Sequence, residues 1–277
     1  VYVDLVRERF AGKEFLTTAM KQEVDRCRMA IEKVVEGKTV SMVCSGDAGV
    51  YGMAGLIYEL AQQYPPIEIC VIPGITAAMS GAAVLGAPLI HDFAVISLSD
   101  LLTPLDKIMT RVELAAQADF VLCFYNPASK KRADYLKQAC QLILKHRSGD
   151  TPCGYVRNIG REGQEAVTLT LSELQDAQVD MFTTVFVGNS QTKLINGKLV
   201  TPRGYKLLLF AGTTEGRELA EYFSTCNVQV TVCVATEYGQ TLILQRENLS
   251  VCAGRLTQQE MEEKIIGEGY DLVVRRS

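Results

Sequence analysis

Short apolar runs alternate with amphipathic stretches along most of this chain, and this alternation is the feature that most limits its fold. Residues 39–44, 67–72, 93–98 and 120–125 are apolar runs of strand length. The segments between them carry apolar residues at helical spacing. Strands that alternate with helices favour a largely parallel sheet. The sequence therefore predicts an α/β fold.

The helices expected between these strands have ordinary start and stop signals. Glycines or prolines open or follow several of them, as is usual at helix ends. We expect helices over residues 20–35, 50–63, 76–85, 104–117 and 129–147.

The pattern becomes mixed after residue 160. Residues 167–171 alternate in polarity, and residues 184–187 form a short apolar run. The pair Asn196 and Gly197 lies between two apolar pairs, which is a strong hairpin signal. We therefore expect antiparallel elements here, and two α/β lobes fit the chain better than one continuous sheet.

A boundary is expected at Pro202-Arg203-Gly204, because proline and glycine interrupt regular structure. A strand, a turn and a helix follow it, as at the front of a Rossmann-like unit. The expected domains are residues 1–118 and 119–204 for the two lobes and residues 205–277 for a partial Rossmann-like α/β unit.

Composition excludes several classes of protein. The chain of 277 residues has a net charge of -4 and no apolar run of the roughly 18 residues that a membrane helix needs. Its nine cysteines include no Cys-x-x-Cys pair. We expect a soluble, cytoplasmic protein with buried free thiols, no disulfide, no metal site, no membrane contact and no nucleic-acid partner. The only basic cluster, residues 130–132, has a solvated helix start as its simplest explanation.

Polar or glycine-rich turns follow three of the expected strands. They are residues 45–49 (Ser-Gly-Asp-Ala-Gly), residues 73–76 (Pro-Gly-Ile-Thr) and Asn126. In open α/β sheets, ligands bind outside the carboxyl ends of the strands. Each turn also has a structural explanation, with Asp47 or Thr76 as a helix N-cap and Asn126 as a turn residue. Their convergence predicts a ligand cleft without naming the ligand.

Five sequence blocks in this order resemble the tetrapyrrole methylase family: residues 44–53, 72–78, 85–93, 96–100 and 125–132. The resemblance covers about residues 1–204 and is greatest to the branch that methylates carbon 17 of precorrin-3B, with ring contraction, in cobalamin (corrin) biosynthesis. It implies a two-lobed tetrapyrrole methylase fold, S-adenosyl-L-methionine as cofactor in the cleft between the lobes, a tetrapyrrole substrate and a homodimer. The family's first strand and its Gly-x-Gly-Pro-Gly loop would precede Val1.

The resemblance also implies the site residues. Those expected to bind the cofactor are Ser45, Gly46, Asp47, Val50, Thr76, Ala77, Asn126, Arg157 and Asn158, the last two from a segment that lies near the adenine in the family. The substrate carries many carboxylates, which Lys130, Lys131 and Arg132 would bind.

Methyl transfer mainly requires that the ring carbon be held against the methyl group, whereas ring contraction requires proton transfer. The candidates for that chemistry are His91, Asp92, Ser97 and Asp100, each of which also has a structural explanation.

The C-terminal segment resembles the start of precorrin-6A reductases, which use a nicotinamide cofactor. The matching blocks are residues 207–220, 235–239 and 253–256. Three alternatives therefore stay open. The first is a methylase relative that acts on another tetrapyrrole, on a protein histidine or on ribosomal RNA. The second is a nicotinamide-dependent oxidoreductase. The third is a remnant without catalysis.

Overall fold

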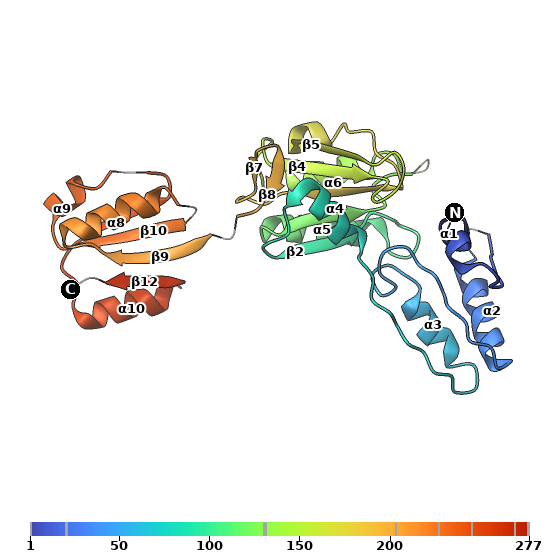
Figure 1. The fold of residues 1–277 in the computed structure, drawn as a ribbon. Helices are drawn as coiled ribbons and strands as arrows, with labels where there is room; N and C mark the ends of the chain where they lie inside the picture. Colours follow the sequence, from blue (N-terminus) through green and yellow to red (C-terminus); the bar gives the residue numbers. More distant parts are fainter. Residues whose placement is uncertain are drawn as a thin grey trace. The chain divides into compact units, whose positions relative to one another are not determined.

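The computed structural model forms two compact units, residues 1–200 and 201–277, which are described separately (Figure 1). It describes residues 2–19, 22–129, 132–202, 204–226, 228–244, 246–268 and 270–275.

A five-stranded mixed sheet with the order β2-β3-β6-β4-β5 is the centre of the first unit. β2 (Phe93–Ser97) pairs in parallel with β3 (Val121–Tyr125), and β6 (Thr183–Val187) pairs antiparallel with both β3 and β4 (Pro152–Arg157). β5 (Glu165–Thr170) pairs antiparallel with β4 at the edge. Because β6 runs opposite to its two neighbours, β2, β3 and β4 all end at the same edge of the sheet.

Helices cover both faces of this sheet, which confirms the α/β prediction. α4 (Ala77–Leu85) packs on one face with the odd-numbered β3 residue Cys123. α5 (Leu105–Gln117), α6 (Tyr135–Ile143) and α7 (Leu171–Leu174) pack on the other face. α6 begins six residues later than we expected. The sheet and its helices include residues on both sides of the lobe boundary expected at 118/119.

Small residues let α4 lie close to the sheet. Ala78, Gly81 and Ala82 are buried on its inner side. A Cβ atom added at Gly81 would lie 2.8 Å from the ring of Phe186 on β6, so a larger residue would push the helix away from the strands.

Two of the expected strands are wrong. Residues 39–44 and 67–72 have no regular secondary structure and form the long loops on either side of α3 (Ala54–Ala61) in Figure 1. An apolar run becomes a strand only when another strand takes up its backbone hydrogen bonds, and no described strand lies against these two. α2 (Glu23–Val35) packs on α3 around a small core that contains Cys27 and Ile31.

The first helical turns of the chain are α1 (Tyr2–Val6) and the 3₁₀ helix η1 (Arg7–Phe10). They precede α2 in the first unit.

The hairpin predicted at Asn196 and Gly197 is confirmed. β7 (Lys193–Ile195) and β8 (Lys198–Val200) pair antiparallel, and β8 also pairs in parallel with β1 (Gly86–Ala87). The two turn residues have φ of 50° and 74°, the left-handed values that a tight type I′ turn requires.

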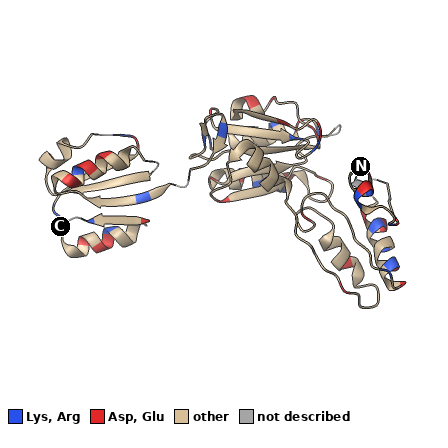
Figure 2. Ribbon diagram, viewed as in Figure 1, with Lys and Arg blue, Asp and Glu red and all other residues tan. Residues whose placement is uncertain are grey.

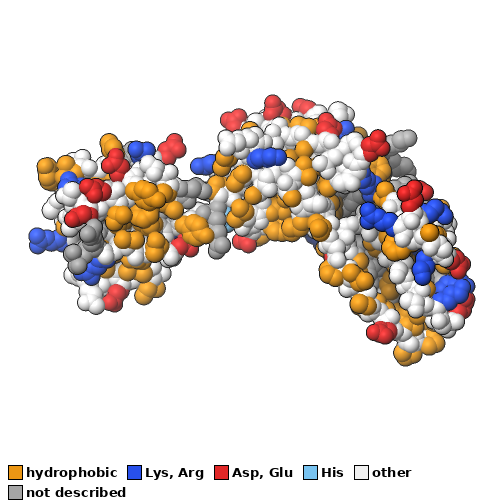
Figure 3. Space-filling view, in the orientation of Figure 1, with side chains coloured by type: hydrophobic (Ala, Val, Ile, Leu, Met, Phe, Trp, Pro, Cys, Tyr) orange, Lys and Arg blue, Asp and Glu red, His pale blue; other side chains and the backbone are white. Residues whose placement is uncertain are grey.

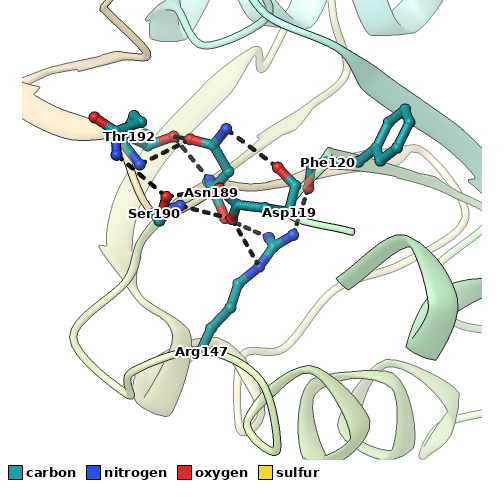
Figure 4. Close-up of polar contacts among 8 residues, drawn as sticks. Asp119, Phe120, Arg147, Asn189, Ser190 and Thr192 are labelled. Carbon is teal, nitrogen blue, oxygen red and sulfur yellow. Dashed lines mark hydrogen bonds and ion pairs between the residues drawn. The ribbon is translucent and has the colours of Figure 1, made fainter. Parts of the chain in front are cut away.

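A buried arginine joins the strand ends at the opposite edge of the five-stranded sheet (Figure 4). The Arg147 guanidinium donates to the carbonyl oxygens of Gly188, after β6, and Phe120, before β3. Its Nε atom lies 4.0 Å from the Asp119 carboxylate, and its side chain is only 3% exposed. The same carboxylate accepts hydrogen bonds from the backbone N–H and the hydroxyl of Ser190. These contacts fix β3 and β6 together where their turns meet.

The second unit is a four-stranded parallel sheet with the order β11-β10-β9-β12. Its core lies between these strands and α8, and includes Leu209, Ala220 and Val232. The expected strand–turn–helix start is confirmed. The elements are β9 (Tyr205–Phe210), α8 (Thr214–Ser224), β10 (Val228–Val234), α9 (Glu237–Thr241), β11 (Leu249–Ala253), α10 (Gln258–Glu268) and β12 (Leu272–Arg275).

Charges of both signs are mixed on the helices, as on α2 and α10 in Figure 2. Among the described residues, no helix is long and apolar enough to span a bilayer. None of the nine cysteines, all of which lie in the described residues, forms a disulfide. Cys123 and Cys233 are buried in strands, and burial raises the pKa of the Cys123 thiol. Cys44 and Cys70, in contrast, lie in the two loops that we expected to be strands.

Candidate functional site

The carboxyl ends of β2 and β3 bring two predicted residues together. Ser97 is the last residue of β2 and lies beside Tyr125, the last residue of β3. Asn126 follows with φ of 51°, and its Nδ2 atom donates to Ser97 Oγ at 3.0 Å. The Ser99 backbone N–H donates to the same oxygen at 3.3 Å. The Ser97 hydroxyl oxygen thus accepts two hydrogen bonds, which is the number that its two lone pairs allow.

The N-terminus of α4 is attached to the end of β3 through Tyr125. The Tyr125 hydroxyl shares a short hydrogen bond with the Thr76 hydroxyl and accepts the Ala78 backbone N–H at 2.7 Å. Thr76 is the N-cap residue by position, but its side chain makes no capping hydrogen bond. Burial raises the pKa of Tyr125, opposed by its hydrogen bonds with Thr76 and Ala78. The start of α4 is therefore attached to the residue that precedes Asn126.

The Asp47 carboxylate joins the two predicted cofactor loops. Its two oxygens accept the backbone N–H of Gly74 at 2.9 Å and of Gly49 at 2.7 Å. These hydrogen bonds, that of Gly74 first, lower the pKa of Asp47. A Cβ atom at Gly74 would collide with the carbonyl oxygen of Gly46, so only glycine permits this approach. Asp47 does not cap the next helix, because α3 begins only at Ala54.

Tyr51 links the same loop to the strands. Its hydroxyl donates to the carbonyl oxygen of Val95 and accepts the N–H of Ser97, both at 3.2 Å. Its ring centroid lies 5.5 Å from that of Tyr125. The loop that carries Ser45, Gly46, Asp47 and Val50 is therefore attached to both strand ends.

Arg157 and Asn158 lie apart from this group. β6 separates their strand, β4, from β3, and strands are about 4.8 Å apart. Arg157 pairs with Glu165 at 3.1 Å and Asp180 at 3.5 Å, and Asn158 donates to the carbonyl oxygen of Gly163. Both lie where β4 ends, and their partners come from β5, from the turn after β4 and from the segment that leads into β6, where Phe182 accepts the Asn158 backbone N–H.

His91 and Asp92 do not join the group at the strand ends. Both precede β2, whereas Ser97 ends it, so the length of the strand, roughly 13 Å, separates them from Ser97. The structure therefore separates the candidate His91 from Ser97 and Asn126.

Asp100 and Arg132 are held by their neighbours. Asp100 accepts the Tyr135 hydroxyl at 2.9 Å and lies 3.8 Å from Arg132 Nε. The Arg132 side chain is 13% exposed and donates to Ser129 and to the carbonyl oxygen of Leu98. It fixes the loops after β2 and β3, which is a different role from the predicted capture of substrate carboxylates. Lys130 and Lys131 lie outside the described residues.

Exposed apolar side chains border the site. Ile72 and Ile75 are 78% and 72% exposed in the loop that carries Gly74. Figure 3 shows hydrophobic side chains on the visible surface of the first unit. Polar groups at the strand ends beside apolar side chains suit a ligand with a flat apolar part and a polar rim.

Sequence reasoning did not assign a role to Tyr51 or Tyr125, although both lie within the family blocks. The only local sign of a role for Tyr51 is its place between two glycines, Gly49 and Gly52, in an expected loop. Its partners are 44 and 46 residues away in sequence, so no local pattern could reveal them.

Comparison with protein families identifies the family of this chain. Residues 3–175, more than half of the chain, match the model described as Tetrapyrrole (Corrin/Porphyrin) Methylases. The chain belongs to the tetrapyrrole methylase family. Residues 206–277, after the methylase part, match the model described as Precorrin-6x reductase CbiJ/CobK. The expected order of a methylase followed by a reductase-like unit is confirmed.

Relatives of this methylase carry related names. A "Cobalt-factor III methyltransferase" of Priestia megaterium is 38% identical over 99% of this chain and 53% of its own length. This chain thus spans about half of that protein. A "Probable cobalt-factor III C(17)-methyltransferase" of Salmonella typhimurium is 45% identical over 74% of this chain and 86% of its own length.

A solved structure supports the methylase fold. The crystal structure of the methyltransferase CobJ is 36% identical, covers 70% of this chain and 84% of its own, and superposes with a TM-score of 0.64. The fold class predicted from the sequence is confirmed.

Proposed function

We propose that this chain transfers a methyl group from S-adenosyl-L-methionine to carbon 17 of a corrin precursor, precorrin-3B or its cobalt form, with ring contraction. The observation that carries the proposal is the convergence of the Asp47 loop, the N-terminus of α4 and the ends of β2 and β3 on one place. The names of the two relatives favour the cobalt-containing substrate.

The residues at this place fit the cofactor. Glycines at positions 46, 49 and 74 allow close backbone approach, and the Asp47 carboxylate supplies acceptor capacity beyond its two backbone bonds. The exposed Ile75 offers apolar contact for a ring. When bound, S-adenosyl-L-methionine supplies an electrophilic methyl group.

The protein's own contribution is to hold the ring carbon in line with that methyl group and to manage protons. Ser97 suits the second task, because its hydroxyl accepts from Asn126 and Ser99 and is free to donate. A fixed donor of this kind stabilises negative charge that develops on a substrate oxygen. We assign Ser97 this role in place of His91.

Titration of the full chain with S-adenosylhomocysteine tests the cofactor site, and we expect saturable binding at one per chain. Incubation with S-adenosyl-L-methionine and either cobalt-factor III or precorrin-3B tests the reaction, with the product analysed by mass spectrometry. Gain of one methyl group is the expected result. A folded sample that binds no S-adenosylhomocysteine and methylates neither tetrapyrrole would contradict the proposal.

Ser97→Ala provides the matched variant. We expect it to bind S-adenosylhomocysteine as the wild type does, and to turn over about 100-fold more slowly, the usual loss for a proton donor. Equal turnover of variant and wild type would remove Ser97 from the mechanism.

We further propose that the enzyme is a cytoplasmic homodimer, as the family resemblance implies; light scattering tests the oligomeric state.

A further inference from the structure

Tyr51 has a backbone conformation that bulky residues rarely adopt. Its φ of 52° lies in the left-handed region, which favours glycine. Its side chain is 60% exposed, so burial does not compensate for the strain. Strain of this kind persists where surrounding contacts over-determine it, and the contacts of Tyr51 are therefore informative.

The Tyr51 hydroxyl occupies the free edge of β2. This strand is the outermost of its sheet, with β3 on its inner side. The hydroxyl bonds the Val95 carbonyl oxygen and the Ser97 N–H, two groups that a neighbouring parallel strand would otherwise bond. One side chain thus fixes the end of β2 at the residue that carries the Ser97 hydroxyl.

The Tyr51 ring reaches the other half of the site. It packs against Tyr125 at 5.5 Å between centroids and an interplanar angle of 54°, a favourable tilted geometry. Tyr125 in turn bonds Thr76 and the first turn of α4. Tyr51 therefore contacts both the strand that carries Ser97 and the residue that holds Thr76.

We infer that Tyr51 is a positioning residue, which holds the Asp47 loop at a fixed distance from Ser97 and Thr76 so that the three converge on one ligand. It contacts β2 and Tyr125 and acts through them. This inference rests on the proposed function.

Tyr51→Phe tests the inference, because it keeps the ring contact with Tyr125 and removes both hydroxyl bonds. The first measurement is hydrogen exchange of the Ser97 amide in the ligand-free protein, which we expect to be about tenfold faster in the variant, since the amide loses its acceptor. The second is titration with S-adenosylhomocysteine, which we expect to bind about tenfold more weakly, or about 1.4 kcal/mol.

Tyr58→Phe is the matched control. Tyr58 is a similarly exposed tyrosine, 49% exposed on α3, and we expect wild-type values in both measurements. Wild-type exchange and wild-type affinity in Tyr51→Phe would overturn the inference. If the wild type itself binds no S-adenosylhomocysteine, the proposed function fails. Amide exchange alone then decides whether Tyr51 holds the loop on β2. Faster exchange in Tyr51→Phe supports this link, and unchanged exchange refutes it.

Discussion

At the scale of single residues, Asp47 shows how one side chain can hold two loops of the candidate site together. Its carboxylate bonds Gly49 in its own loop and Gly74 27 residues further along the chain. Neither bond belongs to a helix or a strand. The link between the two loops of the candidate site therefore runs through a single acidic group.

We expect Asp47→Ala to weaken S-adenosylhomocysteine binding about tenfold, because two backbone N–H groups lose their acceptor and the loops separate. Asp47→Asn retains one acceptor oxygen and should fall between wild type and alanine. Asp176→Ala, at an exposed carboxylate paired with Lys137, is the control. Calorimetric titration measures all four affinities, and equal values for wild type and Asp47→Ala would contradict the prediction.

The same carboxylate predicts a dependence on pH. Because its hydrogen bonds lower the folded-state pKa of Asp47, its stabilisation is fully present above the unfolded-state pKa of about 3.9. It is lost as the pH falls through the lower folded-state pKa. The free energy of unfolding, measured between neutral and acidic pH, should show this loss in the wild type and not in Asp47→Ala.

At the scale of elements, Arg147 connects the turn before β3 with the turn after β6, at the opposite end of these strands from the candidate site. Burial lowers the pKa of Arg147, opposed by the Asp119 carboxylate, yet the guanidinium stays charged. Its bonds to two carbonyl oxygens replace ladder bonds that the strands cannot make beyond their ends.

We expect Arg147→Met to lower the free energy of unfolding by about 3 kcal/mol, because two carbonyl oxygens lose a charged donor and the half-exposed Asp119 carboxylate loses its cation. Lys145→Met removes a nearby exposed pair with Glu113 and should cost less than about 1 kcal/mol. Urea unfolding of both variants measures the difference. Similar losses in the two would show that Arg147 contributes no more than a surface charge.

At the scale of the whole molecule, the methylase and reductase-like units have separate cores. The first unit holds three of the hydrophobic clusters, and the second holds its own cluster around Leu209 and Val232. All described residues of the candidate site lie in the first unit.

Scanning calorimetry of the full chain should therefore show two unfolding transitions, because each core melts cooperatively on its own. S-adenosylhomocysteine at about 100 times its Kd should raise the midpoint of one transition only, since it adds about 2.7 kcal/mol to the unit that binds it. A single transition, or a shift of both, would mean that the units unfold together.

Much of this organisation could be predicted from local patterns. Apolar periodicity predicts α4, α5, β3 and most other elements, and Asn196 with Gly197 predicts the hairpin. The order of the blocks predicts the family. Each of these signals lies within a few residues of sequence, where backbone preference and side-chain spacing act directly.

What local patterns missed depends on partners that are distant in sequence. Residues 39–44 and 67–72 have the composition of strands and lack a neighbouring strand in the structure. The pairing of Arg132 with Asp100 and with the carbonyl oxygen of Leu98 could not be read from its neighbours in sequence. Local composition cannot distinguish a free cation from one that is already paired.

The sequence by itself determined the fold class and the order of a methylase part followed by a reductase-like part. Only the tertiary structure decided that Asp47 bonds Gly74, that Ser97 accepts from Asn126 and that the Tyr51 hydroxyl bonds the edge of β2. The physical reason is that element type follows from local spacing. Hydrogen bonds and packing between segments, in contrast, depend on which distant backbone groups the fold brings within about 3 Å of each other.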